Sequence, residues 1–139
     1  MAEGQASAWR ITGGANVARE PMEVVKAFCD AWSRRNVEEI LAFFTDDGVY
    51  HNIPVAPATG KEAIRNLLNF ILTPAQSVKF DITKIAAAGD TVLTERVDTF
   101  EMGGKQVVLP VAGVFEVRDG KIAAWRDYFD MATWTKQAS

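Results

Sequence analysis

The sequence predicts an α+β fold, in which N-terminal helices pack on one face of a curved, mostly antiparallel sheet. In the first half of the chain, apolar residues recur at spacings of three and four, the period of a helix. From Val78 onward the spacing changes to two, the period of a strand, and turn signals separate the strand-like segments. A sheet covered by helices on one face leaves a pocket between the layers, which is where function is expected.

Three helices are expected before residue 78. Pro21 suits the first turn of one helix, Asn36 can cap a second, and a third begins at Thr59 or Gly60. The apolar stripes of these helices are, in order, Val24, Val25, Phe28, Ala31 and Trp32; Val37, Ile40, Leu41 and Phe44; and Ile64, Leu67, Leu68 and Ile71. A break at 45–48, a short strand at 49–53 and a proline-containing loop at 54–57 separate the second helix from the third.

The second half of the chain reads as strands joined by tight turns. Val78, Phe80 and Ile82 alternate with polar residues in the first of them. Turns are expected at 89–90, 103–104 and 118–121, because each contains glycine. The remaining strands then span 91–102, 106–117 and 122–130.

Composition bounds the function. A chain of 139 residues with 48% hydrophobic residues can build one core, so we expect a single domain over 21–139. An arm without periodicity precedes it over 1–20, and Trp9 and Ile11 are the residues that could attach this arm to the domain. The net charge of -3 argues against nucleic-acid partners, and no apolar run is long enough to predict a membrane span. With no signal-like apolar segment at the N-terminus and a single thiol, the expected compartment is the cytoplasm.

The scarcest residues narrow the chemistry further. One histidine and one cysteine exclude a disulfide within the chain and a Cys/His zinc site, so no metal is expected. Cys29 falls among apolar helix positions and reads as a small buried hydrophobe. If the protein is an enzyme, carboxylates, arginine, tyrosine and asparagine must carry its chemistry.

Charged residues inside the apolar strands are the candidates for that chemistry. Arg96 and Asp98 share one strand face with Val92 and Phe100, and alternation alone leaves open whether this face is the core or a solvent-exposed ion pair. Asp127 shares the more apolar face of the last strand, which makes it the better candidate for an inward carboxylate. An arginine between two carboxylates can leave one of them protonated and the other ionised, as a general acid facing a general base.

A third polar group lies on the short strand at 49–53. Tyr50 and Asn52 share a face, and a phenol with an amide can hold a water molecule; a core-edge tyrosine and a turn asparagine are the plain alternative. His51 points to the opposite face and is expected to be structural or exposed. Arg126 and Asp130 likewise point away from the face of Asp127 and are expected at the surface.

Three segments together resemble the limonene-1,2-epoxide hydrolase family. They are Tyr50-His51-Asn52-Ile53-Pro54; Thr94-Glu95-Arg96-Val97-Asp98; and Gly113-Val114-Phe115 leading through Gly120-Lys121-Ile122 to Trp125-Arg126-Asp127-Tyr128-Phe129-Asp130. The resemblance runs over about residues 20–135. It implies the cone-shaped α+β barrel shared with nuclear transport factor 2 and ketosteroid isomerase, with a mixed, mostly antiparallel sheet and helices on its concave face.

The resemblance also implies roles for five catalytic residues. Tyr50, Asn52 and Asp127 would hold the nucleophilic water, Asp127 as general base; Asp98 would protonate the epoxide oxygen, and Arg96 would orient both carboxylates. The resemblance implies that Arg96 and Asp98 face inward. It implies one-step hydrolysis of a small apolar epoxide to a diol without a cofactor. It also implies a homodimer formed through the sheet. From alternation and the resemblance, the expected pocket lining is Leu72, Val78, Phe80, Leu109, Val111 and Phe129.

Two other functions remain open on sequence grounds. A different enzyme of the same fold, of the ketosteroid-isomerase or polyketide-cyclase kind, needs one base and an oxyanion donor, and has no evident use for an arginine between two acids. A binding module without catalysis is the other, because a fold does not dictate a function.

Overall fold

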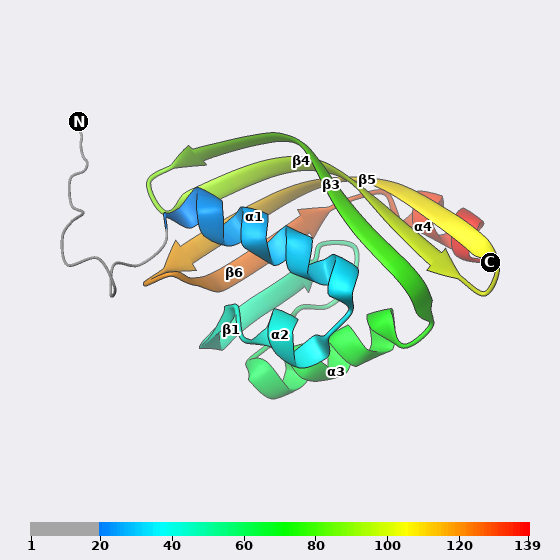
Figure 1. Ribbon diagram of the computed structural model, residues 1–139, viewed down its shortest axis with the longest axis horizontal. Coiled ribbons are helices and arrows are strands. Elements are labelled where there is room, and N and C mark those ends of the chain that lie inside the picture. The colour runs from blue at the N-terminus through cyan, green and yellow to red at the C-terminus, as the bar shows by residue number, and fades with distance from the viewer. Residues whose placement is uncertain (1–19) are drawn as a thin grey trace.

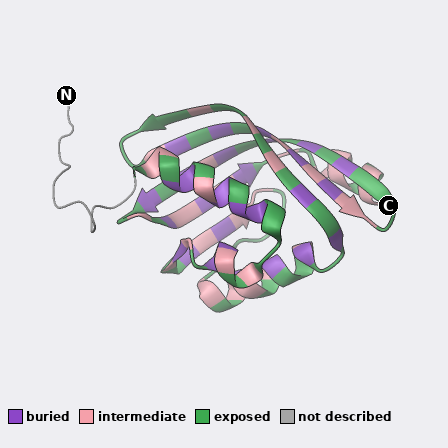
Figure 2. Cartoon of the chain, in the orientation of Figure 1, coloured by how far each residue is buried: buried purple, intermediate pink, exposed green. Residues whose placement is uncertain are grey.

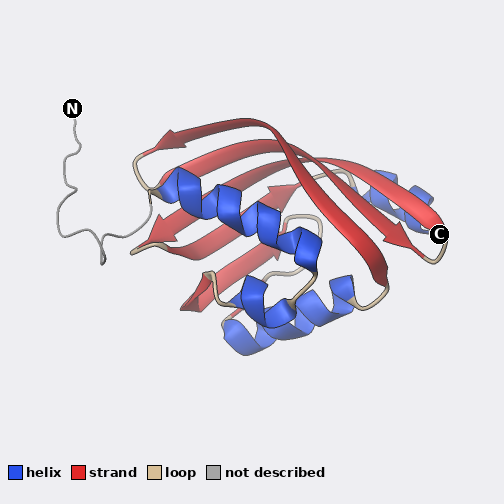
Figure 3. Cartoon of the chain, viewed as in Figure 1, coloured by secondary structure: helices blue, strands red, loops and turns tan. Residues whose placement is uncertain are grey.

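The computed structural model describes residues 20–139, and the predicted arm therefore lies almost entirely outside the described part of the chain. Figures 1 and 3 show a strongly curved sheet with helix α1 lying along its concave face and α2 and α3 closing one side. The helices are α1 (Pro21–Ala31), the short 3₁₀ helix η2 (Trp32–Arg34), α2 (Val37–Leu41), α3 (Lys61–Leu72) and α4 (Met131–Ala138). The strands are β1 (Phe44–Asn52), β2 (Ala58–Thr59), β3 (Ala75–Ala88), β4 (Thr91–Met102), β5 (Lys105–Arg118) and β6 (Lys121–Tyr128).

One six-stranded sheet contains all the described strands, in the order β2-β1-β6-β5-β4-β3. Strands β3 to β6 form an antiparallel meander, and β1 joins it in parallel beside β6. This confirms the predicted fold class, including a mixed but mostly antiparallel sheet.

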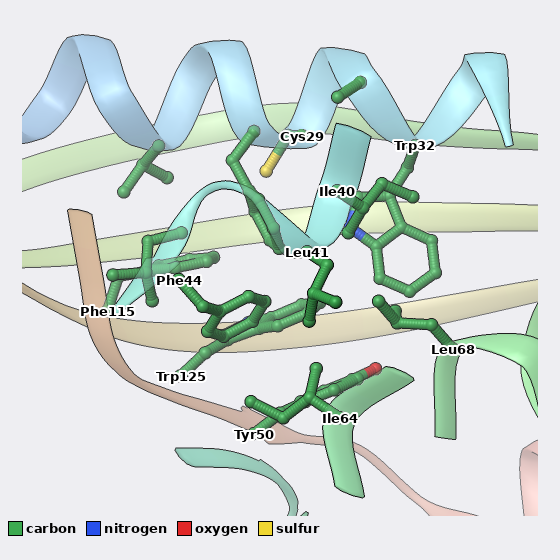
Figure 4. Packing of buried hydrophobic residues seen from close by; sticks show 14 of the residues in the cluster. Cys29, Trp32, Ile40, Leu41, Phe44, Tyr50, Ile64, Leu68, Phe115 and Trp125 are labelled. Atoms are coloured by element: carbon green, nitrogen blue, oxygen red, sulfur yellow. The ribbon is translucent and has the colours of Figure 1, made fainter. Parts of the chain in front are cut away.

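The core lies between α1 and the concave face of the sheet. Five residues of α1 are buried, and every second residue of β5 from Val107 to Val117 is buried, as the period of two predicts (Figure 2). Aromatic rings dominate the contact, since Phe28 meets Trp125 edge to face with 4.9 Å between ring centroids. Trp125 in turn stacks on Tyr50 at 4.1 Å (Figure 4). Cys29 points from α1 into this core and is buried, as predicted.

Several element boundaries differ from the prediction. Phe44 begins β1 instead of ending the second helix, because α2 stops at Leu41, and residues 45–48, which were expected to break the chain, belong to that strand. The two-residue strand β2 and the helix α4 were not predicted. The last strand ends at Tyr128, because the side chain of Asp130 accepts a hydrogen bond from the Thr133 amide and starts α4.

Within residues 20–139, no helix is both long and apolar enough to cross a membrane.

Candidate active site

Arg96, Asp98 and Asp127, here called the charged triad, meet on the concave face of the sheet. Arg96 and Asp98 come from β4 and Asp127 from β6, and each is at most 4% exposed. The face of β4 that carries Arg96 and Asp98 is therefore the inward face of the sheet. Strand β5 lies between β4 and β6, so the triad reaches across it.

The guanidinium of Arg96 holds both carboxylates in a fork. Its Nε and Nη2 donate to the two oxygens of Asp98 at 3.0 and 2.8 Å. Its Nη1 and Nη2 donate to the two oxygens of Asp127 at 3.1 and 2.6 Å. A planar guanidinium with a fixed fork suits such double pairing, whereas the single ammonium of a lysine does not.

Two further polar groups complete the triad. Nη1 of Arg96 also donates to the Thr94 hydroxyl at 3.2 Å. The indole N–H of Trp125 donates to Oδ1 of Asp127 at 2.6 Å. Asp127 therefore accepts three hydrogen bonds and Asp98 two, and the additional donor favours the ionised form of Asp127.

The crossing over β5 is possible because residue 113 is a glycine. A Cβ at Gly113 would lie 2.5 Å from Nη1 of Arg96 and 2.8 Å from Oδ1 of Asp127. Gly113 pairs with Thr94 on one side and with Asp127 on the other. A glycine in the middle of a strand therefore marks the place where the charged side chains pass over the backbone.

Burial sets the electrostatics of the triad. It raises the pKa of Asp98 to about 6, against the opposing attraction of Arg96. Burial also raises the pKa of Asp127, which Arg96 and the Trp125 hydrogen bond oppose. One arginine next to two buried carboxyls is neutralised when the pair keeps one proton, so the arrangement can present one acid and one base.

Tyr50 and Asn52 approach the triad from β1. The parallel pairing with β6 sets Tyr50 beside Trp125 and Asn52 beside Asp127. Burial raises the pKa of the Tyr50 phenol, so it remains a neutral hydroxyl that can both donate and accept hydrogen bonds. His51 points the other way, and its Nε2 lies 2.9 Å from the Val55 carbonyl oxygen.

A pocket of about 170 Å³ opens beside these groups. Tyr50, Asn52, Asp98 and Asp127 line one part of it, and the remaining wall is apolar. The apolar lining consists of Trp32, Val55, Leu67, Phe70, Ile71, Phe80, Phe100, Leu109, Val111, Phe129, Met131 and Trp134. Arg96 lies behind the two carboxylates rather than in this lining.

Four of the six residues predicted to line the pocket are in its wall: Phe80, Leu109, Val111 and Phe129. The other two, Leu72 and Val78, are absent from this wall and are buried in the hydrophobic core. Leu72 lies on the stripe of α3 that carries Ile64 and Leu68, while Leu67, Phe70 and Ile71 turn toward the pocket. Val78 pairs with Phe100, and only the larger partner reaches the pocket.

Sequence reasoning missed several residues of the site. Trp125 and Gly113 both carried a signal, since Trp125 shares the face of Asp127 and Gly113 interrupts an apolar strand. Trp32 was assigned to the core, yet it also lines the pocket, and its indole N–H has no hydrogen-bond partner among the described residues. Met131 and Trp134 belong to the unpredicted helix α4.

The sequence model of the limonene-1,2-epoxide hydrolase catalytic domain matches residues 19–139. The chain belongs to this family. It is also 37% identical over 107 residues to epoxide hydrolase EphG of Mycobacterium tuberculosis, covering 77% of this chain and 71% of that protein.

Solved structures agree with this assignment. The structure of a limonene-epoxide-hydrolase-like epoxide hydrolase of M. tuberculosis superposes with a TM-score of 0.75 at 35% identity, covering 84% of this chain and 87% of that one. A structure described as a SnoaL-like polyketide cyclase from Shewanella putrefaciens has a TM-score of 0.77 at 16% identity, covering 85% and 95%. The second likeness extends to the fold alone.

Proposed function

We propose that this family member hydrolyses small apolar epoxides, cyclic or terpenoid-like, to vicinal diols in a single step. The observation that supports this most strongly is the charged triad: one arginine bridges two buried carboxyls that face an apolar pocket. Opening an epoxide with water needs one group to remove a proton and another to supply one.

In this mechanism each carboxyl has one task. Ionised Asp127, with Tyr50 and Asn52, orients a water molecule and takes its proton as the water oxygen bonds to an epoxide carbon. Protonated Asp98 gives its proton to the epoxide oxygen as the bond between that oxygen and the attacked carbon breaks. The proton then passes from Asp127 back to Asp98 to restore the starting state, and Arg96 keeps both carboxyls in place throughout.

The shape of the pocket supports a compact apolar substrate. A volume of about 170 Å³ suits a small ring system, and the aromatic lining offers no charged partner away from the triad. Acid, base and water-binding groups are all side chains of this chain, so the proposed reaction needs neither a metal nor a cofactor.

We further propose that the protein acts as a homodimer in the cytoplasm. The convex face of the sheet supports the dimer, because Leu93 and Tyr128 remain 51% and 45% exposed there. The single cysteine, which is buried, is compatible with a reducing compartment.

The decisive experiment uses ¹⁸O-labelled water in a single turnover with excess enzyme over cyclohexene oxide. Direct attack by water puts the label in the diol during the first turnover. A diol without label would contradict the proposal, because its oxygen would come from a carboxylate of the protein through an ester. An isomerised ketone with no diol would instead favour an isomerase of the same fold.

Variants of the two carboxyls test the assigned roles. Asp127→Asn and Asp98→Asn are each expected to lower kcat by a factor on the order of 10² to 10⁴, because each removes one proton-transfer group. Asp81→Asn, an exposed aspartate of β3, is the matched control and should be fully active. Substantial turnover by either triad variant would contradict the role given to that residue.

A further inference from the structure

The helix α4 forms part of the pocket wall although none of its residues is buried. Met131 and Trp134 reach the lining, and Trp134 meets Phe100 edge to face with 5.2 Å between ring centroids. The position of this part of the wall therefore depends on the contacts that fix α4 to the sheet.

The side-chain amide of Gln137 makes this attachment. Its Nε2 donates to the carbonyl oxygen of Val108 on β5 at 2.9 Å, and its Oε1 accepts from the amide nitrogen of the same residue at 2.9 Å. Nε2 also donates to the carbonyl oxygen of Thr133 at 3.1 Å, which fixes the side chain against its own helix.

Val108 lies where β5 has a partner strand on one side only. Among the described strands, β5 pairs with β4 from Lys105 onward, but its pairing with β6 covers only Ala112–Arg118. The main-chain groups of Val108 that bond to Gln137 therefore point away from β4, toward the open edge. Unpaired main-chain groups at such an edge favour pairing with other strands.

A primary amide carries both a donor and an acceptor, as a peptide group does. Gln137 thus occupies the place that a neighbouring strand residue would take at this edge. Trp134 lies one turn before it on the same helix, on the side that faces the pocket.

We propose that Gln137 is a positioning residue that docks α4 on the open edge of β5 and thereby holds Trp134 in place as a wall of the pocket. The effect on substrate preference rests on the proposed function, whereas the docking does not. Because Gln137 is absent from the pocket lining and the hydrogen bonds of the charged triad involve no residue of α4, its effect should fall on substrate binding and not on the chemical step.

Hydrogen–deuterium exchange of segment 131–138 tests the docking without any need for turnover. In Gln137→Ala, exchange of this segment should be roughly five- to thirtyfold faster, because the variant loses both hydrogen bonds to Val108. Gln137→Glu keeps the acceptor and loses the donor to Val108, so it should also exchange faster. Lys136→Gln is the control and should match the wild type, because Lys136 is an exposed neighbour whose side chain makes no hydrogen bond to any residue within 20–139.

Steady-state kinetics test the consequence for the pocket. With cyclohexene oxide, Gln137→Ala should raise KM severalfold and leave kcat within about twofold, the pattern of lost uniform binding. The ratio of kcat/KM for limonene oxide over cyclohexene oxide should rise, because a displaced wall excludes larger rings less strictly.

Unchanged exchange in Gln137→Ala would overturn the proposal whatever the enzyme hydrolyses. Faster exchange combined with a lower kcat at constant KM would overturn the positioning role. If the wild type formed no diol, the proposed function would fail while the exchange result still decided the docking.

Discussion

At the scale of single residues, the Arg96 guanidinium is closely surrounded by other described residues. Four hydrogen bonds tie it to two carboxylates, and the Phe80 ring lies 4.8 Å from its central carbon. Such a group cannot move aside to admit a new atom without breaking a charge-assisted bond.

The substitution Gly113→Ala should therefore disrupt the triad. Its Cβ would lie 2.5 Å from Nη1 of Arg96, so we expect a loss of about 1–3 kcal/mol in unfolding free energy. Misplacing catalytic groups by about 1 Å costs on the order of a hundredfold in rate. Denaturant unfolding and kcat measure both, and Ala112→Gly, on the exposed side of the same strand, is the comparison. A fully active Gly113→Ala would mean that the cluster is looser than its distances indicate.

The pKa values of the two carboxyls predict a bell-shaped dependence of kcat/KM on pH. Asp98 must carry a proton, and with a pKa of about 6 it loses that proton as the pH rises, so the rate should fall about tenfold per pH unit on the alkaline side. Asp127 must be ionised, and its raised pKa makes the rate fall again on the acidic side. A profile that stays flat from pH 4 to pH 9 would contradict the two-carboxyl mechanism.

Trp125→Phe should move one arm of this profile. The indole N–H stabilises the charged form of Asp127, so its loss should raise the pKa of that carboxyl and shift the acidic arm to higher pH. The core contact of Trp125 is largely kept by a phenyl ring, and thermal unfolding checks this. An unshifted acidic arm in a folded variant would indicate that Asp127 is not the base.

The sequence alone identified residue types better than it identified contacts. Scarcity of His and Cys directed attention to carboxylates, and alternation placed Asp127 inward. Alternation could not choose a face for Arg96, because both faces of β4 carry apolar residues. Nor could it find the Thr94 and Trp125 hydrogen bonds, which depend on distances between side chains.

At the scale of elements, α2 shows how a single cap defines a short helix. Only five residues long, it begins where the side chain of Asn36 accepts a hydrogen bond from the Glu39 amide at 2.9 Å. Helices this short have little stability of their own. The cap and the burial of Ile40 and Leu41 therefore stabilise α2.

Asn36→Ala should lower the free energy of unfolding by about 1 kcal/mol, the usual cost of losing an N-cap. Asn36→Asp keeps the acceptor and should be close to the wild type in denaturant unfolding. Both variants should keep full kcat, because α2 contributes no residue to the pocket lining. Equal destabilisation of the two variants would mean that the cap hydrogen bond is not what the alanine removes.

The elements that the prediction missed lack a clear period. Strand β2 has two residues, too few to alternate. Helix α4 has eight residues and a weak apolar stripe, but Asp130 followed three residues later by Thr133 was a readable cap. Phe44 continues the helical spacing of Val37, Ile40 and Leu41, so the sequence alone placed it in the helix. The structure ends α2 at Leu41, and Phe44 is buried as the first residue of β1.

At the scale of the whole molecule, the convex face of the sheet leaves large apolar residues exposed among charged ones in one chain. Leu93 pairs with Val114, and Ala112 pairs with the exposed Tyr128, so the apolar positions of adjacent strands adjoin. A sheet face of this kind is typical of an interface.

We therefore expect a dimer in sedimentation velocity, and Leu93→Asp should shift it toward the monomer. The charge would have to be buried at the interface without a partner, which is costly. Lys26→Ala on the exposed side of α1 is the control and should sediment like the wild type. A monomeric wild type at micromolar concentration would contradict the dimer.

Long-range pairing was the part of the fold that the sequence could not define. The meander follows from turn signals between neighbouring strands, but nothing local states that β1 runs parallel to β6. Tyr50 and Asn52 could therefore be singled out for their chemistry, while their position beside Asp127 required the structure.

That parallel pairing has a consequence for the order in which the protein matures. Residues 44–52 are synthesised long before residues 121–128, and until the later segment leaves the ribosome β1 has no neighbour in the meander. A nascent chain that ends before Lys121 already carries Tyr50, Asn52, Arg96 and Asp98, with one carboxyl to neutralise the arginine. The last strand thus completes the sheet and the charged triad together, because two of the four hydrogen bonds between Arg96 and the carboxylates form only with Asp127.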